Sequence, residues 1–426
     1  MKELQQNRDD PGGITREKPW HGPEGLRAFR HRNFTLYWIG QVISFTGTWV
    51  QTVAQGWLVL KLTGSALDLG IVGAANTFPV LLLGLPAGAI ADRLDKRRVV
   101  IVTQTLAMMQ AFALAALTFA GVIRVWHVIV LAICAGAIGA FDNPIRQSML
   151  VELVDGNKDD ILSCVSLSST AFNGARVLGP ALAGVTLVAV GIANCFFINA
   201  ISYIAALIAL LMMKPMHSPS KNAQSGAMLS QIWDGLSHAW KNELLRDLLL
   251  MSAISGVFGS QINTVMPVFA DKVFRMGPKG LGVLMAAIGI GALFGAVINT
   301  VLGHRFRQRT LVFFGGLLCA ASLLAFSRSG YFHLATVFLA LTGLGTMLFM
   351  TVSNTIIQEA APDSLRGRVI SVRIFVLTGL APVGALLIGF LAERFGVQNA
   401  VTILGAASLA SAIYFTLRSK AIRSFE

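Results

Sequence analysis

The sequence predicts an all-α integral membrane protein in which twelve transmembrane helices form two pseudo-symmetric six-helix halves. Three observations support this fold class. Hydrophobic residues make up 54% of the 426 residues and charged residues only 13%, and the mean hydropathy is +0.67, which lies outside the soluble range. The chain divides into apolar runs long enough to cross a hydrocarbon core of about 30 Å. Motifs of the first half recur roughly half a chain later.

The apolar runs define the domain organisation. Residues 1–32 are polar and predict a cytoplasmic tail, and the first run is too long for the core of a signal peptide, so it should remain as a helix. Residues 33–213 form the N-terminal half, residues 214–245 a cytoplasmic linker with an amphipathic helix around Ile232, Leu236 and Trp240, residues 246–417 the C-terminal half, and residues 418–426 a cytoplasmic tail. The runs span residues 36–60, 68–91, 99–121, 126–148, 164–190, 194–213, 248–270, 280–302, 310–327, 332–357, 369–391 and 397–417.

The distribution of basic residues predicts the orientation. The turn between the second and third runs holds Arg93, Lys96, Arg97 and Arg98, and the other loops on that side are also rich in Arg and Lys, whereas the opposite loops hold few. Short basic loops remain in the cytoplasm. The expected location is therefore the cytoplasmic membrane, with both termini in the cytoplasm.

Internal repetition predicts two related halves. Asn143 and Gln147 near the end of the fourth run correspond to Asn354 and Gln358 near the end of the tenth, and Leu69-Gly70 corresponds to Leu281-Gly282. Duplicated six-helix halves joined by a linker are typical of transporters, whose substrate site lies between the halves near the midplane.

Other classes of protein lack support in the sequence. The net charge of +13 is spread over short loops rather than gathered on one soluble domain, so no nucleic-acid partner is expected. The four cysteines, Cys134, Cys164, Cys195 and Cys319, are widely separated, and no metal-binding, hydrolase or ATP-binding motif occurs. We expect no enzyme activity, catalytic residue, metal or cofactor.

A polar face on the first helix predicts part of a substrate cavity. Its members recur three or four residues apart and so share one side of the helix; they are Gln41, Ser44, Thr48, Gln51 and Gln55. The alternative is that these side chains hydrogen-bond neighbouring helices, as polar residues in membrane bundles often do. In the seventh helix, Gln261 and Asn263 are the residues expected on the opposing wall, with Ser252, Gly259, Ser260 and Thr264 beside them.

The fifth helix carries a cation near its middle. Arg176 lies on one face with Ser166, Ser169 and Asn173. An arginine at membrane depth is a candidate functional residue, and the alternative is a structural cation bound to carbonyls of neighbouring helices. If Arg176 faces the cavity, it favours substrates with anionic or electron-rich groups.

From residue 30 onward the sequence resembles the major facilitator superfamily. The stretch Gly88 to Arg98 is similar to its signature between helices 2 and 3, with Gly88, Asp92 and Arg93 in place, although Asp95 replaces the second glycine. The stretch Gly174 to Gly184 resembles the helix 5 signature of its antiporters. Phe34-x-x-Tyr37-Trp38 and the segment 362–369 resemble the subgroup of enterobactin exporters and macrolide efflux pumps.

The resemblance also implies roles for individual residues. Asp142 is expected to pair with Lys96 or Arg97, and Asp92 to meet the start of the eleventh helix near Arg368, but only when the cytoplasmic ends of the halves are together. With Gly88, Arg93 and Arg146 these residues would form a latch on the outward-facing state, and the alternative is an ordinary ion pair at the interface. Asp142 is also the proton-coupling candidate, with Asp68 and Asp271 behind it, because helix 1 and residues 72–88 of helix 2 have no carboxylate. Gly179, Pro180 and Gly184 suit a hinge or a tightly packed seam.

The expected function is export of a small amphipathic molecule, such as a drug or siderophore, by alternating access, driven by proton antiport. The expected partners are the substrate, protons and the lipid bilayer, and the expected state is a monomer. Two alternatives remain: a proton-coupled nutrient importer of the same fold, and a membrane receptor or scaffold without transport.

Overall fold

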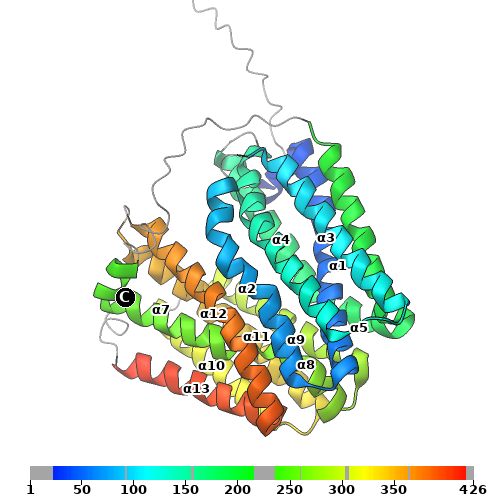
Figure 1. Cartoon of the computed structure of the whole chain (residues 1–426). Coiled ribbons are helices and arrows are strands. Elements are labelled where there is room, and N and C mark those ends of the chain that lie inside the picture. The colour runs from blue at the N-terminus through cyan, green and yellow to red at the C-terminus, as the bar shows by residue number, and fades with distance from the viewer. Residues whose placement is uncertain are drawn as a thin grey trace, which may run out of the picture.

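The computed structural model describes residues 23–91, 94–154, 158–214, 236–259, 261–302, 307–362 and 365–418, and these residues contain helices and no strand (Figure 1). In the N-terminal half the helices are α1 (Arg32–Thr63), α2 (Ala66–Ala91), α3 (Lys96–Phe119), α4 (Val125–Glu152) and α5 (Lys158–Leu211). In the C-terminal half they are α7 (Glu243–Ile254), α8 (Ile262–Val268), α9 (Gly277–Leu302), α10 (Gln308–Arg328), α11 (Phe332–Ala360), α12 (Arg366–Phe395) and α13 (Val397–Arg418).

The expected all-α membrane fold is confirmed. Ten helical segments of the described chain are long and apolar enough to cross a membrane. One of them, α5, has 54 residues and breaks at Gly191, whose φ of +82° is left-handed. An unbroken helix of that length would extend about 80 Å, so α5 contains two crossings. With α1, whose polar face lowers its hydropathy, the described helices account for the twelve expected crossings.

The seventh crossing is interrupted. It begins with α7, passes through a π-helical turn at Ser255–Gly259, continues in α8, and ends in a second π-helical turn at Phe269–Val273. Pro267 lies inside α8 and removes one backbone donor. Interrupted membrane helices are tolerated where protein or a wet cavity surrounds the backbone, so this crossing is suited to the interior of the molecule.

The two halves meet through an exchanged pair of contacts. Helix α2 packs against α12, and the first part of α5 packs against α9. Helices α2 and α9 are the second crossings of their halves. The first part of α5 and helix α12 are the fifth crossings. Each contact therefore joins the second crossing of one half to the fifth crossing of the other, and a pseudo-twofold axis relates the two contacts. Figure 1 shows α2 and α12 side by side at the centre of the molecule.

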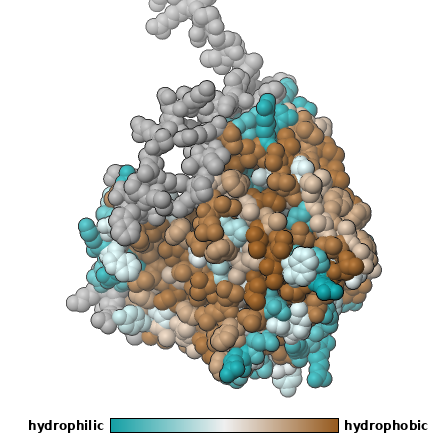
Figure 2. Space-filling model, viewed as in Figure 1, coloured by the Kyte–Doolittle hydropathy of each residue, from teal (hydrophilic) through white to brown (hydrophobic). Residues whose placement is uncertain are grey.

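The outer surface has the distribution of a membrane protein. Figure 2 shows apolar residues over the middle of the visible face and polar residues towards its edges. Large apolar side chains such as Leu178, Val185 and Phe294 are exposed by 60%, 64% and 61%. Exposed apolar surface on this scale fits contact with lipid acyl chains.

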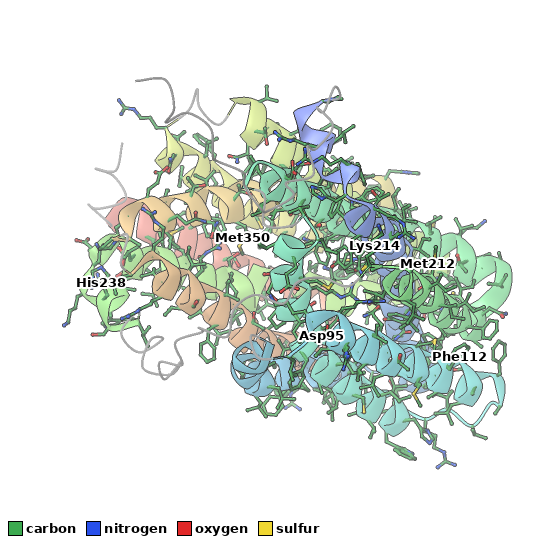
Figure 3. The ribbon with its side chains drawn as sticks, turned by 90° about the horizontal axis from the view of Figure 1, so that it is seen from above. Asp95, Phe112, Met212, Lys214, His238 and Met350 are labelled. Carbon is green, nitrogen blue, oxygen red and sulfur yellow. The ribbon has the colours of Figure 1, made fainter. Side chains whose placement is uncertain are left out.

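Buried clusters distinguish the two ends of the bundle. We call the end where α1, α3 and α12 begin the basic end, and the end where α2, α4 and α13 begin the far end. At the basic end one cluster contains only N-terminal residues, including Phe34 and Met149, and another contains only C-terminal residues, including Leu248 and Val372. Figure 3 views the molecule from above, with Lys214 in the first bundle and His238 and Met350 in the second.

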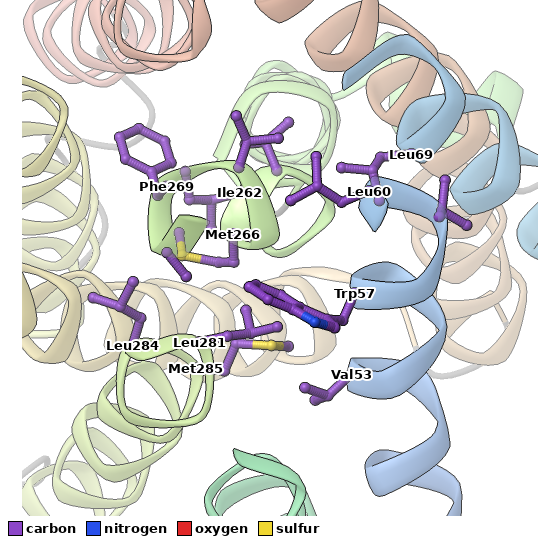
Figure 4. Close-up of a cluster of buried hydrophobic side chains, with 14 of the residues drawn as sticks. Val53, Trp57, Leu60, Leu69, Ile262, Met266, Phe269, Leu281, Leu284 and Met285 are labelled. Atoms are coloured by element: carbon purple, nitrogen blue, oxygen red, sulfur yellow. The ribbon is translucent and has the colours of Figure 1, made fainter. Parts of the chain in front are cut away.

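The far end instead has one core shared by both halves. Figure 4 shows Val53, Trp57 and Leu69 of the N-terminal half packed with Met266 and Leu281 of the C-terminal half. These side chains are at most 4% exposed. The halves are therefore sealed together at the far end, whereas at the basic end the described residues form separate cores.

Two features near the predicted domain boundaries refine the expected organisation. Residues Glu24–Arg30 of the expected tail form a short 3-10 helix that docks on the start of α5. Of the residues around which the sequence predicts an amphipathic linker helix, Leu236 and Trp240 are helical and Ile232 lies outside the described residues, so the amphipathic helix stays a prediction. Helix α7 begins at Glu243, slightly earlier than the predicted boundary, because Asn242 caps it by accepting the Leu245 amide through its side chain.

Candidate substrate crevice

Two close helix contacts join the halves where the sequence predicts the substrate site. A Cβ on Gly184 of α5 would lie 2.9 Å from the Cα of Gly282 in α9, and a Cβ on Gly389 of α12 would lie 3.0 Å from the Cα of Gly70 in α2. Such distances leave no space for a side chain. Glycine at these four positions lets both seams close backbone to backbone.

Gln51 lies in a buried hydrogen-bond network inside the N-terminal bundle. Its Nε2 donates to Gln110 Oε1 of α3 at 3.1 Å, and its Oε1 accepts from Asn199 Nδ2 of α5 at 2.7 Å. Asn199 also accepts from Ser202 Oγ at 3.1 Å. Gln51 therefore holds three helices of one half together, which is the alternative considered for the polar face.

Gln41 and Ser44 are also buried, with 3% and 1% of their surface exposed. The expectation that Gln41, Ser44 and Gln51 line a substrate cavity is therefore corrected in this conformation. The physical reason is that Gly40 and Gly47 of the same helix bring α1 against Ala206 and Ser202 of α5, which covers this side of α1.

Thr48 and Gln55 remain accessible. Thr48 is exposed although its hydroxyl contacts Tyr203 Oη at 3.2 Å, and Gln55 is partly exposed. Thr52, one turn beyond Thr48, is exposed as well and bonds only to its own helix, at the Thr48 carbonyl. Of the predicted polar face of α1, only Thr48 and Gln55 are accessible, and Thr52 beside them is accessible as well.

Arg176 lies on the side of α5 opposite Leu178 and Val185, two exposed apolar residues of the same helix. Residues two positions apart are about 200° apart around a helix, so the exposed Leu178 lies nearly opposite Arg176. Asn173 shares the side of Arg176, and its Nδ2 donates to the Ser169 carbonyl at 2.9 Å. Val177, the next residue, packs close to Gly289 of α9. This geometry places Asn173 and Arg176 beside the α5–α9 seam.

The Arg176 guanidinium is half-buried and makes no ion pair or hydrogen bond with any residue that the structure describes. A structural arginine at membrane depth would be expected to bond to carbonyls or carboxylates. The observed arrangement favours the functional alternative, in which the guanidinium is available to a ligand.

The opposing wall comes from the interrupted seventh crossing. Gln261 lies between the first π-helical turn and α8, and its Nε2 donates to the Gly256 carbonyl at 3.3 Å. Asn263 is partly exposed in α8, and Thr264 approaches Gly73 of α2 in the other half. Of the residues named beside them, Ser252 is fully buried, whereas Ser260 lies outside the described residues.

Asp142 and Arg146 form a buried ion pair one turn apart on α4. Asp142 Oδ1 also accepts from Thr103 Oγ1 at 2.6 Å and from Gln104 Nε2 at 3.2 Å, both on α3. The Arg146 guanidinium lies 5.5 Å from the ring centre of Phe45 in α1. The pair is therefore enclosed by three helices of one half.

In this conformation Asp142 does not pair with Lys96 or Arg97, and the expected pairing stays a prediction for the conformation in which the basic end is closed. Lys96 Nζ pairs with Glu152 at 2.6 Å, and Arg97 donates to the carbonyls of Leu210 and Leu211 at 2.8 and 3.0 Å. Residues 142 and 152 are about 15 Å apart along α4, so the basic turn reaches Glu152 at the end of the helix before it can reach Asp142.

The remaining latch residues are only partly described. Gly88 lies in the last turns of α2 and Arg368 in the first turn of α12, while Asp92 and Arg93 lie outside the described residues. The predicted contact between Asp92 and the start of α12 therefore stays a prediction.

Gly179, Pro180 and Gly184 all lie at close contacts of α5. A Cβ on Gly179 would collide with Trp49 of α1, and the Pro180 carbonyl oxygen would lie 2.9 Å from a Cβ on Gly282. The three residues form the tight seam considered for them, and a hinge function stays a prediction.

Sequence reasoning missed a second charged cluster at the basic end. Asp160 is fully buried and contacts Arg27 Nε at 2.8 Å, Arg30 Nη2 at 2.6 Å and His31 Nε2 at 2.8 Å. The Ala28 amide donates to Ser163 Oγ at 3.1 Å. The closely spaced cations just before the first apolar run were the available signal, but their partner lies more than a hundred residues away.

Comparison with known proteins agrees with this architecture. A family model described as transmembrane secretion effector matches residues 24–425. The chain belongs to this family of membrane transporters, within the major facilitator superfamily.

Individual relatives are similar over most of their length. The multidrug efflux pump Tap of Mycolicibacterium fortuitum is 28% identical over 83% of this chain and 87% of its own, and the staphyloferrin A transporter of Staphylococcus aureus is 27% identical over 87% and 92%. Macrolide efflux protein A of Streptococcus pyogenes is 22% identical over 89% and 94%.

Solved structures confirm the fold. A bacterial homologue of the human lysosomal transporter Spinster, in an inward-facing and unoccupied conformation, superposes with a TM-score of 0.75 at 12% identity, covering 95% of this chain and 98% of its own. The D-xylose–proton symporter gives a TM-score of 0.68 at 14% identity, covering 93% and 99%.

Proposed function

We propose that this protein exports a small amphipathic molecule across the cytoplasmic membrane by alternating access. The observation that carries the proposal is the unpartnered Arg176, beside a seam between two six-helix halves that are sealed at one end only. An alternating-access transporter needs such a site, reachable from one side at a time. Relatives named for efflux of drugs and macrolides support export as the direction, and a relative named as a staphyloferrin A transporter supports a siderophore as one class of substrate.

The proposed orientation places the basic end in the cytoplasm, as the excess of Arg and Lys in its loops favours. In this orientation the sealed far end faces outward, and the described conformation is open to the cytoplasm. A substrate would then enter between Thr48 of α1, Asn173 and Arg176 of α5, and Asn263 of α8. Arg176 favours a molecule that carries an anionic or electron-rich group.

We propose proton antiport as the energy source and Asp142 as the titrating group. Asp142 is a buried carboxylate held by Arg146 and by two neutral donors. A proton on Asp142 would release Arg146, whose guanidinium already lies against Phe45 in α1. Protonation of Asp142 on α4 would thereby change the contact of Arg146 with α1, a helix that contributes to the crevice wall.

The proposal includes a single-chain transporter that needs no cofactor and carries out no catalysis. The nutrient importer of the same fold is the second candidate, and it differs only in the direction of net flux. The available Arg176 has no role in a purely structural scaffold, and a receptor that binds a ligand without transport is distinguished by the absence of flux.

The experiment is export of a panel of amphipathic compounds, with and without an anionic group, from cells that overproduce the protein. A protonophore should abolish export. Asp142→Asn should uncouple export from the proton gradient, whereas the matched control Asp95→Asn, at an exposed cap of α3, should not. Net uptake would establish the importer, and absence of flux for every compound in purified proteoliposomes would exclude transport of this class.

A further inference from the structure

The far end carries polar contacts that cross from one half to the other. Lys61 Nζ at the end of α1 pairs with Asp271 Oδ1 at 3.0 Å, and Lys272 Nζ donates to the Gly64 carbonyl at 2.6 Å. These groups are partly or fully exposed. They lie at the rim of the sealed mouth, around the shared apolar core.

Glu393 makes the most extensive of these contacts. It lies at the end of α12, and its Oε2 accepts from the Ala66 amide at 2.8 Å, the Leu67 amide at 3.4 Å and Ser65 Oγ at 3.1 Å. The first amides of a helix have no partner within the helix and carry the positive end of its dipole. A carboxylate of the C-terminal half thus caps the first turn of a helix of the N-terminal half.

The start of α2 also has caps from its own half. Ser65 Oγ accepts from the Asp68 amide at 3.2 Å, and Thr63 Oγ1 accepts from the Ser65 amide at 3.2 Å. Both contacts lie within the N-terminal half, so they do not depend on contact between the halves. Helix α2 therefore does not need Glu393 in order to begin at Ala66, and the contribution of Glu393 depends on the closure of the far end.

We propose that Glu393 is the gating residue of the far mouth. Its carboxylate stabilises the conformation in which the far end is sealed, and the contact must break in each cycle that opens this end. The Lys61–Asp271 pair acts in the same direction with less effect, because Lys61 also lies 4.9 Å above the ring of Trp57 in its own half. The functional meaning of the gate depends on the proposed transport, but its effect on conformation does not.

The test measures the accessibility of each mouth directly. Purified protein in nanodiscs, in which both faces are free, carries one reporter cysteine in a background where all four native cysteines are replaced by alanine. Val53→Cys reports the far mouth, because Val53 is 2% exposed in the core shared by the halves. Asn143→Cys, at an exposed position of α4 near the basic end, reports the other mouth. A membrane-impermeant maleimide is the probe.

Glu393→Gln should raise the labelling rate at Val53→Cys about two- to five-fold and lower the rate at Asn143→Cys, as expected when a charge leaves a helix N-terminus. The matched control is Asp68→Asn, which removes the same charge from the same mouth within one half and should leave both rates unchanged. Glu393→Asp should restore part of the wild-type behaviour.

Two results would overturn the gate. One is equal labelling of Glu393→Gln and wild type at both reporters. The other is faster labelling at both mouths together, which indicates a loosened fold rather than a shifted equilibrium. Neither result depends on finding a substrate, so failure of the gate and failure of the transport function remain distinguishable.

Discussion

Gly184 of α5 and Gly282 of α9 meet backbone to backbone across the two halves, and Gly70 of α2 meets Gly389 of α12 in the corresponding place. The repeat relates Gly70 to Gly282, so the internal repeat reappears as two equivalent seams. Small residues at contacts between membrane helices let the two backbones approach closely, which favours packing of helix on helix. The seams are surfaces along which the halves are positioned relative to one another.

Enlarging a seam glycine should block transport without unfolding the protein. Gly184→Val places a branched side chain against the backbone of α9, which forces the seam apart. We expect export to fall by about tenfold or more, in line with overpacking of about 1–3 kcal/mol. The control is Gly174→Val in the same helix, because a Cβ there meets no atom within 4 Å. Normal export by Gly184→Val would show that the seam is not tight.

Arg176→Ala should reduce export of anionic compounds by about tenfold or more, since a hydrogen bond to a charged group contributes about 1.5–3 kcal/mol. Neutral compounds should be affected much less. The measurement compares initial export rates of paired anionic and neutral analogues, with Arg176→Lys as the variant that keeps the charge. Arg98→Ala, at a side chain 85% exposed on the basic end, is the control. Unchanged rates for every compound would remove Arg176 from the site.

Gln51→Ala should lower thermal stability, because the variant leaves Gln110 and Asn199 without their buried partner. The expected loss is about 0.6–2 kcal/mol, the range for hydrogen bonds between membrane helices. Thermal unfolding in detergent, followed by intrinsic fluorescence, measures the effect. Thr52→Ala on the same helix should change the Tm little, since its hydroxyl bonds only to α1 itself. An equal Tm for both variants would argue against a structural network.

Asp160→Ala should release the segment Glu24–Arg30 from the start of α5. The substitution leaves Arg27, Arg30 and His31 facing a site from which their buried counter-charge is gone. We expect amide hydrogen exchange across residues 24–30 to accelerate by at least about tenfold, with little change in α9 or α10. Protection that persists at the wild-type level would show that Ser163 and apolar contacts alone hold the segment.

Sequence by itself determined the number of crossings, because the lipid bilayer requires each crossing helix to have a certain length and hydropathy, and both can be read from local composition. It also determined the repeat, because matching motifs recur half a chain apart. It also identified Arg176, since a cation in an apolar run is visible without knowing its neighbours. The sequence predicts a hinge or tight seam at Gly184 and relates Gly70 to Gly282 by the repeat, but it does not pair Gly184 with Gly282 across the halves.

Only the tertiary structure decided which polar residues face a neighbouring helix and which face the crevice. Gln41, Ser44 and Gln51 would show the same spacing along α1 whether they lined a cavity or bonded to a neighbouring helix. They are buried because Gly40 and Gly47 allow α5 to approach α1 closely. Asp142 likewise took the nearest cation, Arg146, rather than the basic turn. The contact of Glu393 with α2 joins residues more than three hundred positions apart, and no local pattern records such a pairing, because it arises from the packing of two whole halves.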